Sequence, residues 1–320
     1  MPSRRTAALS LLTLPALARA AATPEVQRGA WDASQAQTDQ FRLWQGAEGR
    51  RLVLLLPPFG GDADYYRSSK LPQLLAVRGI DLAVLHTHAT GFLERAELAR
   101  LDRLIGVLLQ RYARPPARVA IGGFSAGGFA ALRYAQWAAE AGTHPPANEA
   151  PSLRPVAAFS VDAPLDLVRW YEGMKRGRDR LLAHRPSSPY LGEMKYLVPF
   201  LEGLMGGSPE QALAAYEGQS VFSAARPDGG NARWLRDVAL RLYTEPDAAF
   251  FVEQGLDWVS SNSSDQLALT ALLRLQGHQQ VSLVLTQGRG IRPELGNARM
   301  PHAWSIVDEP ELADWLDRNL

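Results

Sequence analysis

The sequence predicts an α/β fold with a mostly parallel central sheet, flanked by helices, and an inserted helical lid. Short apolar runs alternate with stretches of helical periodicity along most of the chain, as in right-handed β-α-β units. Residues 52–56 are apolar on both faces, which is typical of a central strand covered on both sides. In such a sheet, ligands bind at the carboxyl ends of the strands.

Each element is predicted in chain order from the spacing of its apolar residues. Apolar or alternating runs predict strands at residues 41–44, 52–56, 81–86, 118–122, 156–161, 238–243 and 281–285. Helical spacing predicts helices at residues 67–77, 94–112, 128–141 and 309–320. A glycine turn between the first two strands favours a hairpin between them, whereas residues 23–36 have no clear period.

Residues of about 166–236 break this alternation. Short helix-like pieces at 167–173, 190–204 and 209–216 are separated by proline and glycine, and none of the segment resembles a core strand. We therefore expect a lid inserted into the sheet domain. Its aromatic side chains are candidates either for lining an apolar pocket or for packing the lid onto the sheet: Trp170, Tyr171, Tyr190, Tyr196, Phe200 and Tyr216.

The composition suits a globular chain with a large core. The 320 residues are 46% apolar, which allows one large domain or two small ones. The absence of cysteine excludes disulfides, thiolate metal sites and a cysteine nucleophile. The formal net charge is only +1, and no basic patch indicates a nucleic-acid partner.

Residues 1–20 have the pattern of an export signal. Arg4-Arg5 precedes an apolar stretch at residues 7–17, and residues 18–20 form an A-x-A cleavage pattern. The stretch is shorter than the roughly 20 residues of a membrane-spanning helix, although an uncleaved anchor is an alternative. We expect a periplasmic or secreted protein in which residues 21–320 form the mature domain, with no stable insertion in a membrane. The Sec and Tat export routes both stay open.

Ser125 is the candidate nucleophile. It is the centre of Gly123-Phe124-Ser125-Ala126-Gly127, a G-x-S-x-G pattern between a predicted strand and a predicted helix. A serine in such a sharp turn is exposed for attack, and the flanking glycines remove Cβ atoms that would clash with the crossing backbone. This context favours a catalytic serine over an ordinary Gly-Ser loop.

A serine nucleophile needs a base, usually a histidine held by a carboxylate. Of the histidines after Ser125, His144 falls in a proline-rich connection, His184 in the predicted lid, and His278 before the last strand. His302 follows that strand and precedes the terminal helix. It is therefore the candidate base.

Two strand ends offer a carboxylate for His302. Asp247 follows the predicted strand at 238–243, and Asp162 follows the strand at 156–161. The sequence order Ser, acid, His with the acid after the penultimate strand favours Asp247. Asp162 is the alternative acid, and Glu245 is a further one.

These features resemble the α/β-hydrolase superfamily over nearly all of the mature sequence. The residues that carry the resemblance are the serine pentapeptide, Asp247 after a late strand, and His302 near the end of the chain. The resemblance implies a Ser-His-Asp triad and the α/β-hydrolase fold. The order and spacing of the pentapeptide, Asp247 and His302 are a more specific signal than any one of these features alone.

The resemblance also implies an oxyanion hole. One donor would be the backbone N–H of Ala126, and the other would come from the loop at residues 57–62, where Phe59 or Gly60 is the candidate. This loop lacks the H-G-G-G form of some lipases and esterases, so a plain Pro-Gly turn is the alternative.

The resemblance therefore predicts an exported serine hydrolase that works through an acyl-enzyme, most simply on carboxylic esters. A serine exopeptidase or amidase of the same fold and a non-catalytic binding protein are the alternatives. The expected partner is a small acyl substrate, and the oligomeric state stays open. His86 and His88 alternate along a strand and could share a metal, but no third ligand is evident, so we expect neither metal nor cofactor.

Overall fold

The computed structural model describes residues 25–30, 40–45, 50–87, 95–113, 115–143, 151–293 and 296–320. The predicted export signal lies outside these residues. In the described part, eight strands form one sheet in the order β1-β2-β4-β3-β5-β6-β7-β8. The strands are β1 (Glu25–Ala30), β2 (Gln40–Gln45), β3 (Arg51–Leu56), β4 (Asp81–His86), β5 (Arg118–Phe124), β6 (Ala157–Val161), β7 (Ala239–Thr244) and β8 (Val281–Leu285).

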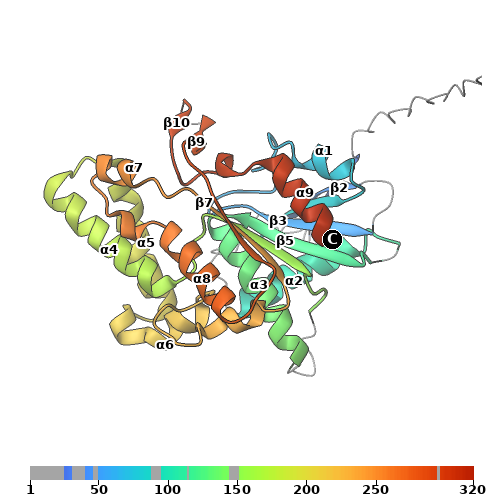
Figure 1. The fold of residues 1–320 in the computed structure, drawn as a ribbon, viewed down its shortest axis with the longest axis horizontal. Helices are drawn as coiled ribbons and strands as arrows, with labels where there is room; N and C mark the ends of the chain where they lie inside the picture. The colour runs from blue at the N-terminus through green and yellow to red at the C-terminus, as the bar shows by residue number, and fades with distance from the viewer. Residues whose placement is uncertain are drawn as a thin grey trace, which may run out of the picture.

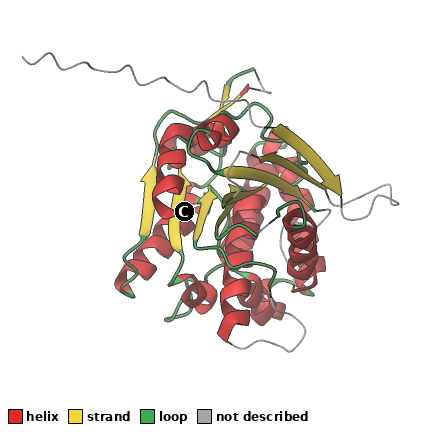
Figure 2. Cartoon of the chain, turned by 90° about the vertical axis from the view of Figure 1, so that its right-hand side faces the viewer, coloured by secondary structure: helices red, strands yellow, loops and turns green. Residues whose placement is uncertain are grey.

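Helices cover both faces of this sheet (Figures 1 and 2). The helices are α1 (Leu71–Ala76), α2 (Arg95–Leu109), α3 (Ala126–Thr143), α4 (Leu167–His184), α5 (Pro189–Met205), α6 (Pro209–Gln219), α7 (Ala248–Glu253), α8 (Ser263–Leu275) and α9 (Glu309–Asn319). Helix α1 is shorter than predicted, because single turns occupy residues 63–68 before it. Helix α4 extends well beyond the predicted piece.

The pairing of the strands confirms the predicted fold class. Strands β3 to β8 pair in parallel, each next to its neighbour in the sheet, whereas β1 and β2 are antiparallel. Because all the parallel strands run the same way, their carboxyl ends meet at one edge of the sheet. This edge carries Ser125 after β5 and Asp162 after β6.

The predicted hairpin between the first two strands is wrong. Strand β2 pairs with β4, and β4 separates it from β3. Strand β3 is buried on both faces and takes the central place between β4 and β5, which leaves β2 toward the sheet edge. Strand β1, which pairs with β2, has no predicted counterpart because its residues lack a clear period.

Alternate residues of the central strands divide the core into two layers. Leu52 and Leu54 of β3 pack with α2, α3 and α8 on one face. Val53 and Leu55 point the other way and pack with α1 and α9. Because the side chains of a strand alternate between its two faces, each face of the sheet packs against its own layer of helices. This packing on both faces fixes the positions of the strand ends.

Helices α4, α5 and α6 stand between β6 and β7, in the interval where the sequence predicted the insertion. They lie together at the left of Figure 1, beside the sheet. Asp166 begins α4 by accepting hydrogen bonds from the N–H groups of Val168 and Arg169. Val198 and Leu201 of α5 belong to the same buried cluster as the sheet, so the insertion packs onto the core.

Candidate active site

Ser125 lies in a strained turn between β5 and α3. Its φ is 55°, in the left-handed region that non-glycine residues seldom adopt. Its N–H donates to the carbonyl of Val161 at 2.9 Å, and its carbonyl accepts from the N–H of Phe129 at 3.0 Å. These bonds fasten the turn to β6 on one side and to α3 on the other.

The two glycines of the pentapeptide are required by the close approach of β3. A Cβ on Gly127 would lie 2.2 Å from the carbonyl oxygen of Leu56 and 2.5 Å from that of Pro57. A Cβ on Gly123 would lie 2.5 Å from the same Leu56 oxygen. The start of α3 therefore lies directly against the loop that follows β3, as the predicted oxyanion hole requires.

Tyr66 connects the ends of β3 and β5. Its hydroxyl donates to the carbonyl of Leu56 at 2.9 Å and accepts from the N–H of Phe124 at 3.1 Å. Its ring is buried and contacts Trp304 edge-on, with centroids 4.8 Å apart. Burial raises the pKa of Tyr66 well above its usual value, so the hydroxyl stays protonated. Nothing in the sequence pattern indicated this role.

The structure brings Ser125, His302 and Asp162 into one hydrogen-bonded chain. His302 Nε2 lies 3.0 Å from Ser125 Oγ, and His302 Nδ1 lies 2.7 Å from Asp162 Oδ2. The imidazole packs against the Phe124 ring at a centroid distance of 4.7 Å. With the Nδ1 proton on the Asp162 side, Nε2 is free to accept the serine proton.

Asp162 is held on several sides. Its side chain is 9% exposed, and its second oxygen, Oδ1, accepts the Thr244 hydroxyl at 2.6 Å. Its N–H donates to the Tyr243 carbonyl at 2.8 Å, and its own carbonyl accepts the Asn262 side chain at 2.8 Å. Its φ of 45° is also left-handed. The strained backbone aims the carboxylate at His302.

The predicted pairing of Asp247 with His302 is wrong. Asp247 follows β7 as expected, but its carboxylate accepts from Arg299 Nε at 2.7 Å and from the N–H of Phe250 at 3.0 Å. The Arg299 hydrogen bond lowers the pKa of Asp247, so it stays charged in this pair. Arg299 precedes His302 by only three residues, but the sequence does not indicate that it folds back onto Asp247.

Glu245, the third candidate acid, holds the loop after β8 instead. It is buried, and its carboxylate accepts the Thr286 hydroxyl at 3.0 Å and the N–H groups of Arg289 and Gly290 at 2.9 and 3.1 Å. Gly290 in turn accepts the N–H of Met300 at 2.8 Å. Glu245 is thus connected to the segment that carries His302, without being its hydrogen-bond partner.

The remaining histidines that the structure describes have other surroundings. His278 is buried just before β8, where its Nε2 contacts the carbonyls of Leu235 and Val238 ahead of β7. His184 lies in the last turn of α4. His144 and His88 lie outside the described residues, so the predicted pair of His86 and His88 is not seen together. Within the described ranges, no group of three or more His, Cys, Asp or Glu side chains is placed to hold a metal ion.

Comparisons with known proteins identify the fold. No protein-family model and no curated protein matches the sequence. Solved structures do match: a carboxyl esterase of the fungus Tuber melanosporum aligns over 95% of this chain and 89% of its own, at 11% identity and a TM-score of 0.59. An esterase of the bacterial hormone-sensitive lipase family aligns over 92% and 84%, at 16% identity and a TM-score of 0.54.

This chain has the α/β-hydrolase fold. An acylaminoacyl peptidase of Pyrococcus horikoshii also matches, over 93% of this chain but 42% of its own, at 12% identity and a TM-score of 0.55. In this chain, the carboxylate that contacts His302 follows β6, the strand next to the serine strand β5, and not β7. Because β6 lies between β5 and β7, Asp162 reaches the histidine from a neighbouring strand end.

A cavity of about 170 Å³ opens at Ser125 beneath the inserted helices, and we call it the lid cavity. Ser125, Ala126 and His302 are among the residues that line it. The inserted helices contribute Trp170, Met174, Glu193, Met194 and Leu197. Of the other lid aromatics, Tyr171 and Tyr216 are buried against each other, whereas Tyr196 and Phe200 stack on each other and contact Phe59.

The loop after β3, residues 57–62, lies beside Ala126. The Gly61 N–H closes a turn to the Pro58 carbonyl at 2.9 Å, and Gly60 has a φ of 73°. Pro57 and Pro58 carry no amide hydrogen. Phe59 and Gly60 therefore stay the candidates for the second oxyanion donor. No helix in the described part of the chain is long and apolar enough to cross a membrane.

Proposed function

We propose that the protein is a serine hydrolase of carboxylic esters that works through a covalent acyl-enzyme. The observation that carries this proposal is the chain of hydrogen bonds from Ser125 Oγ through His302 to Asp162. It provides a nucleophile, a base and a carboxylate that orients the base. The esterases among the similar structures support an ester as the substrate.

The reaction starts when Ser125 Oγ attacks the ester carbonyl carbon and His302 Nε2 takes the serine proton. Asp162 stabilises the imidazolium that forms, and the N–H groups of Ala126 and of Phe59 or Gly60 bind the oxyanion. Collapse of the tetrahedral intermediate breaks the ester bond, and the Nε2 proton goes to the leaving alkoxide. Water, activated by the same histidine, then attacks the acyl-enzyme and releases the carboxylic acid.

Two variants test the nucleophile and the base. Ser125→Ala and His302→Ala should each lower kcat for p-nitrophenyl acetate on the order of 10⁴-fold or more, as in triads elsewhere. A fluorophosphonate should label the wild-type protein at Ser125 and fail to label Ser125→Ala. Near-wild-type turnover in either variant would remove the proposal, and absence of labelling would favour a binding protein.

The similarity to a peptidase supports one alternative, an amidase or exopeptidase. Peptide and anilide substrates with the same acyl group as a cleaved ester would decide between them. Higher kcat/KM for the amide than for the ester would favour the peptidase.

We also propose export, on the pattern of residues 1–20. Mass spectrometry of the protein recovered from its native host should find the mature chain beginning after Ala20. A full-length chain in the cytoplasm would contradict export while leaving the hydrolase proposal intact.

A further inference from the structure

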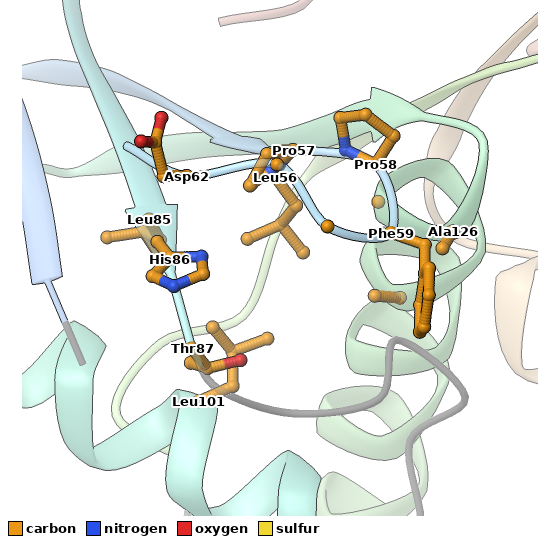
Figure 3. A pocket seen from close by; sticks show the side chains of 14 residues that line it. Leu56, Pro57, Pro58, Phe59, Asp62, Leu85, His86, Thr87, Leu101 and Ala126 are labelled. Atoms are coloured by element: carbon orange, nitrogen blue, oxygen red, sulfur yellow. The ribbon is translucent and has the colours of Figure 1, made fainter. Parts of the chain in front are cut away.

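The lid cavity is the space next to the reacting atoms, because both Ser125 and His302 line it. A second cavity, of about 390 Å³, is lined by residues 57–62 and shares Phe59 and Ala126 with the lid cavity (Figure 3). Neither Ser125 nor His302 is among the described residues that line this second cavity. The side chains that meet a substrate beside its scissile bond are therefore those of the lid cavity.

Two of the inserted helices each contribute one face to the lid cavity. Trp170 and Met174 of α4 are four residues apart, so they lie on the same face of that helix. Glu193 and Leu197 of α5 have the same spacing. Leu197 is buried in the main core cluster, which fixes α5 one turn away from Glu193. The inserted helices thus place an indole ring, a thioether and a carboxylate around one cavity.

Glu193 gives this lining a negative charge. The rest of the lining is apolar or uncharged apart from the imidazole of His302, and no described lysine or arginine belongs to it. The Glu193 side chain has no hydrogen-bond or ion-pair partner in the described part of the chain. In a mostly apolar pocket, a single charged group of this kind determines which ligands are selected.

Arg292 is a basic residue whose charge acts on the same neighbour as Glu193. Burial raises the pKa of Tyr190, Arg292 opposes this rise, and Glu193 adds to it. Arg292 Nη2, however, donates to the carbonyl oxygen of His302 at 3.1 Å, and Arg292 does not line the lid cavity. Among the described residues, no basic side chain therefore neutralises Glu193 within the cavity.

We infer that the lid cavity takes the positively charged group of a cationic ester, and that Glu193 selects for this charge; the inference rests on the proposed function. A carboxylate in the lining attracts an ammonium group and repels a substrate that carries a carboxylate. The aromatic ring of Trp170 and the thioether of Met174 are polarizable surfaces that suit a methylated ammonium group. The charge can belong to either half of the ester, because Ser125 and His302 line the same cavity.

Two pairs of esters test this inference, one pair for each half of the substrate. The first pair is acetylcholine and its uncharged isostere, in which a tert-butyl group replaces the trimethylammonium group. The second pair is the ethyl ester of trimethylammoniobutyric acid and its tert-butyl isostere. The released acid is titrated at constant pH, and each kcat/KM is divided by the rate constant for hydrolysis of the same ester by hydroxide. In at least one pair, the corrected kcat/KM should be higher for the cationic ester.

Glu193→Gln removes the charge and keeps the shape of the side chain. It should lower the cationic-to-neutral ratio of kcat/KM by about fivefold in that pair, the upper end for an ion pair that is exposed to solvent. Glu193→Lys should lower the ratio further, by repulsion between like charges. Both variants should hydrolyse the uncharged esters as fast as the wild type. High salt should bring the wild-type ratio toward that of Glu193→Gln, because salt screens exposed charges.

Asp179→Asn is the matched control. Asp179 belongs to α4, its side chain is 55% exposed, and its carboxylate pairs with Arg178 at 2.9 Å. It does not line the lid cavity. Asp179→Asn therefore removes one negative charge from the inserted helices without changing the cavity, and it should leave the cationic-to-neutral ratio as in the wild type.

Three outcomes would overturn the inference. These are a wild-type preference for the uncharged ester in both pairs, a ratio that Glu193→Gln leaves unchanged, and an equal fall of the ratio in Asp179→Asn. Hydrolysis of p-nitrophenyl acetate without hydrolysis of either cationic ester would also overturn it, while the proposed function stands. The proposed function itself fails differently, by the absence of all ester hydrolysis and of fluorophosphonate labelling in the wild-type protein.

Discussion

Replacing Asp162 by asparagine tests the assignment that separates the structure from the sequence prediction. The carboxylate accepts two short hydrogen bonds, one from His302 Nδ1 at 2.7 Å and one from the Thr244 hydroxyl at 2.6 Å. An asparagine amide has one acceptor oxygen, so it can preserve only one of these bonds as it stands. The size of the effect depends on which way the amide points.

In one orientation the amide oxygen faces His302 and the NH₂ group faces Thr244. Thr244 Oγ1 can accept that group, because it can donate its own proton to Ser263 Oγ, 2.7 Å away. The histidine tautomer is then kept, and only the charge beside the imidazolium is lost. A hydrogen bond to a charged group contributes about 1.5–3 kcal/mol, which corresponds to a loss of roughly 10- to 150-fold in kcat.

In the other orientation the NH₂ group faces Nδ1. The imidazole then carries its proton on Nε2 and cannot accept the proton of Ser125, which costs about 10⁴-fold in kcat. We therefore expect Asp162→Asn to lower kcat by about 10- to 10⁴-fold, according to the orientation that the amide takes, with the thermal midpoint measured in parallel to confirm folding. The assay is steady-state hydrolysis of p-nitrophenyl acetate.

Asp247→Asn is the matched control. Asparagine still caps α7, and the lost ion pair joins Asp247 to an Arg299 side chain that is 44% exposed, where such pairs contribute only about 0–1 kcal/mol. Its kcat should stay within about fivefold of the wild type, because about 1 kcal/mol corresponds to roughly a fivefold change in rate. A folded Asp162→Asn protein with wild-type kcat, or an equal loss in Asp247→Asn, would refute the assignment.

Three further predictions concern the groups that hold the site. In Glu245→Gln, the carboxylate that accepts three hydrogen bonds is replaced by an amide whose NH₂ group would face the Gly290 N–H. We expect a roughly tenfold lower kcat with little change in KM, as for the loss of one hydrogen bond to a charged group. An unaltered kcat would show that this loop does not position His302. Tyr66→Phe leaves the Leu56 carbonyl and the Phe124 N–H without their partner, and urea unfolding should show a loss of about 2–4 kcal/mol, whereas a loss near zero would mean that water replaces the hydroxyl. Since the folded pKa of Tyr66 lies well above the unfolded value of 10.0, its contribution to stability should be complete below pH 10 and fall as the pH rises further, and the fall should be smaller in Tyr66→Phe.

The fold was predictable because its signals are local. The continuous apolar run of β3 indicates burial on both faces, and the alternation of strands with helices indicates a parallel sheet. The pairing of β2 was not predictable in this way, since the partner of a strand depends on which strand competes for the central place. Strand β1 was missed because its residues have neither alternation nor a continuous apolar run.

The strand-turn-helix position of Ser125 and the order of the late loops were present in the sequence, and they suffice to select His302 from six histidines. The sequence did not determine which acid contacts His302. Asp162 and Asp247 both follow parallel strands, and their roles are separated by contacts with residues far away in the chain: Thr244 supports the first, and Arg299 neutralises the second. Local periodicity encodes where a strand ends, but only the packed chain determines which side chains meet there.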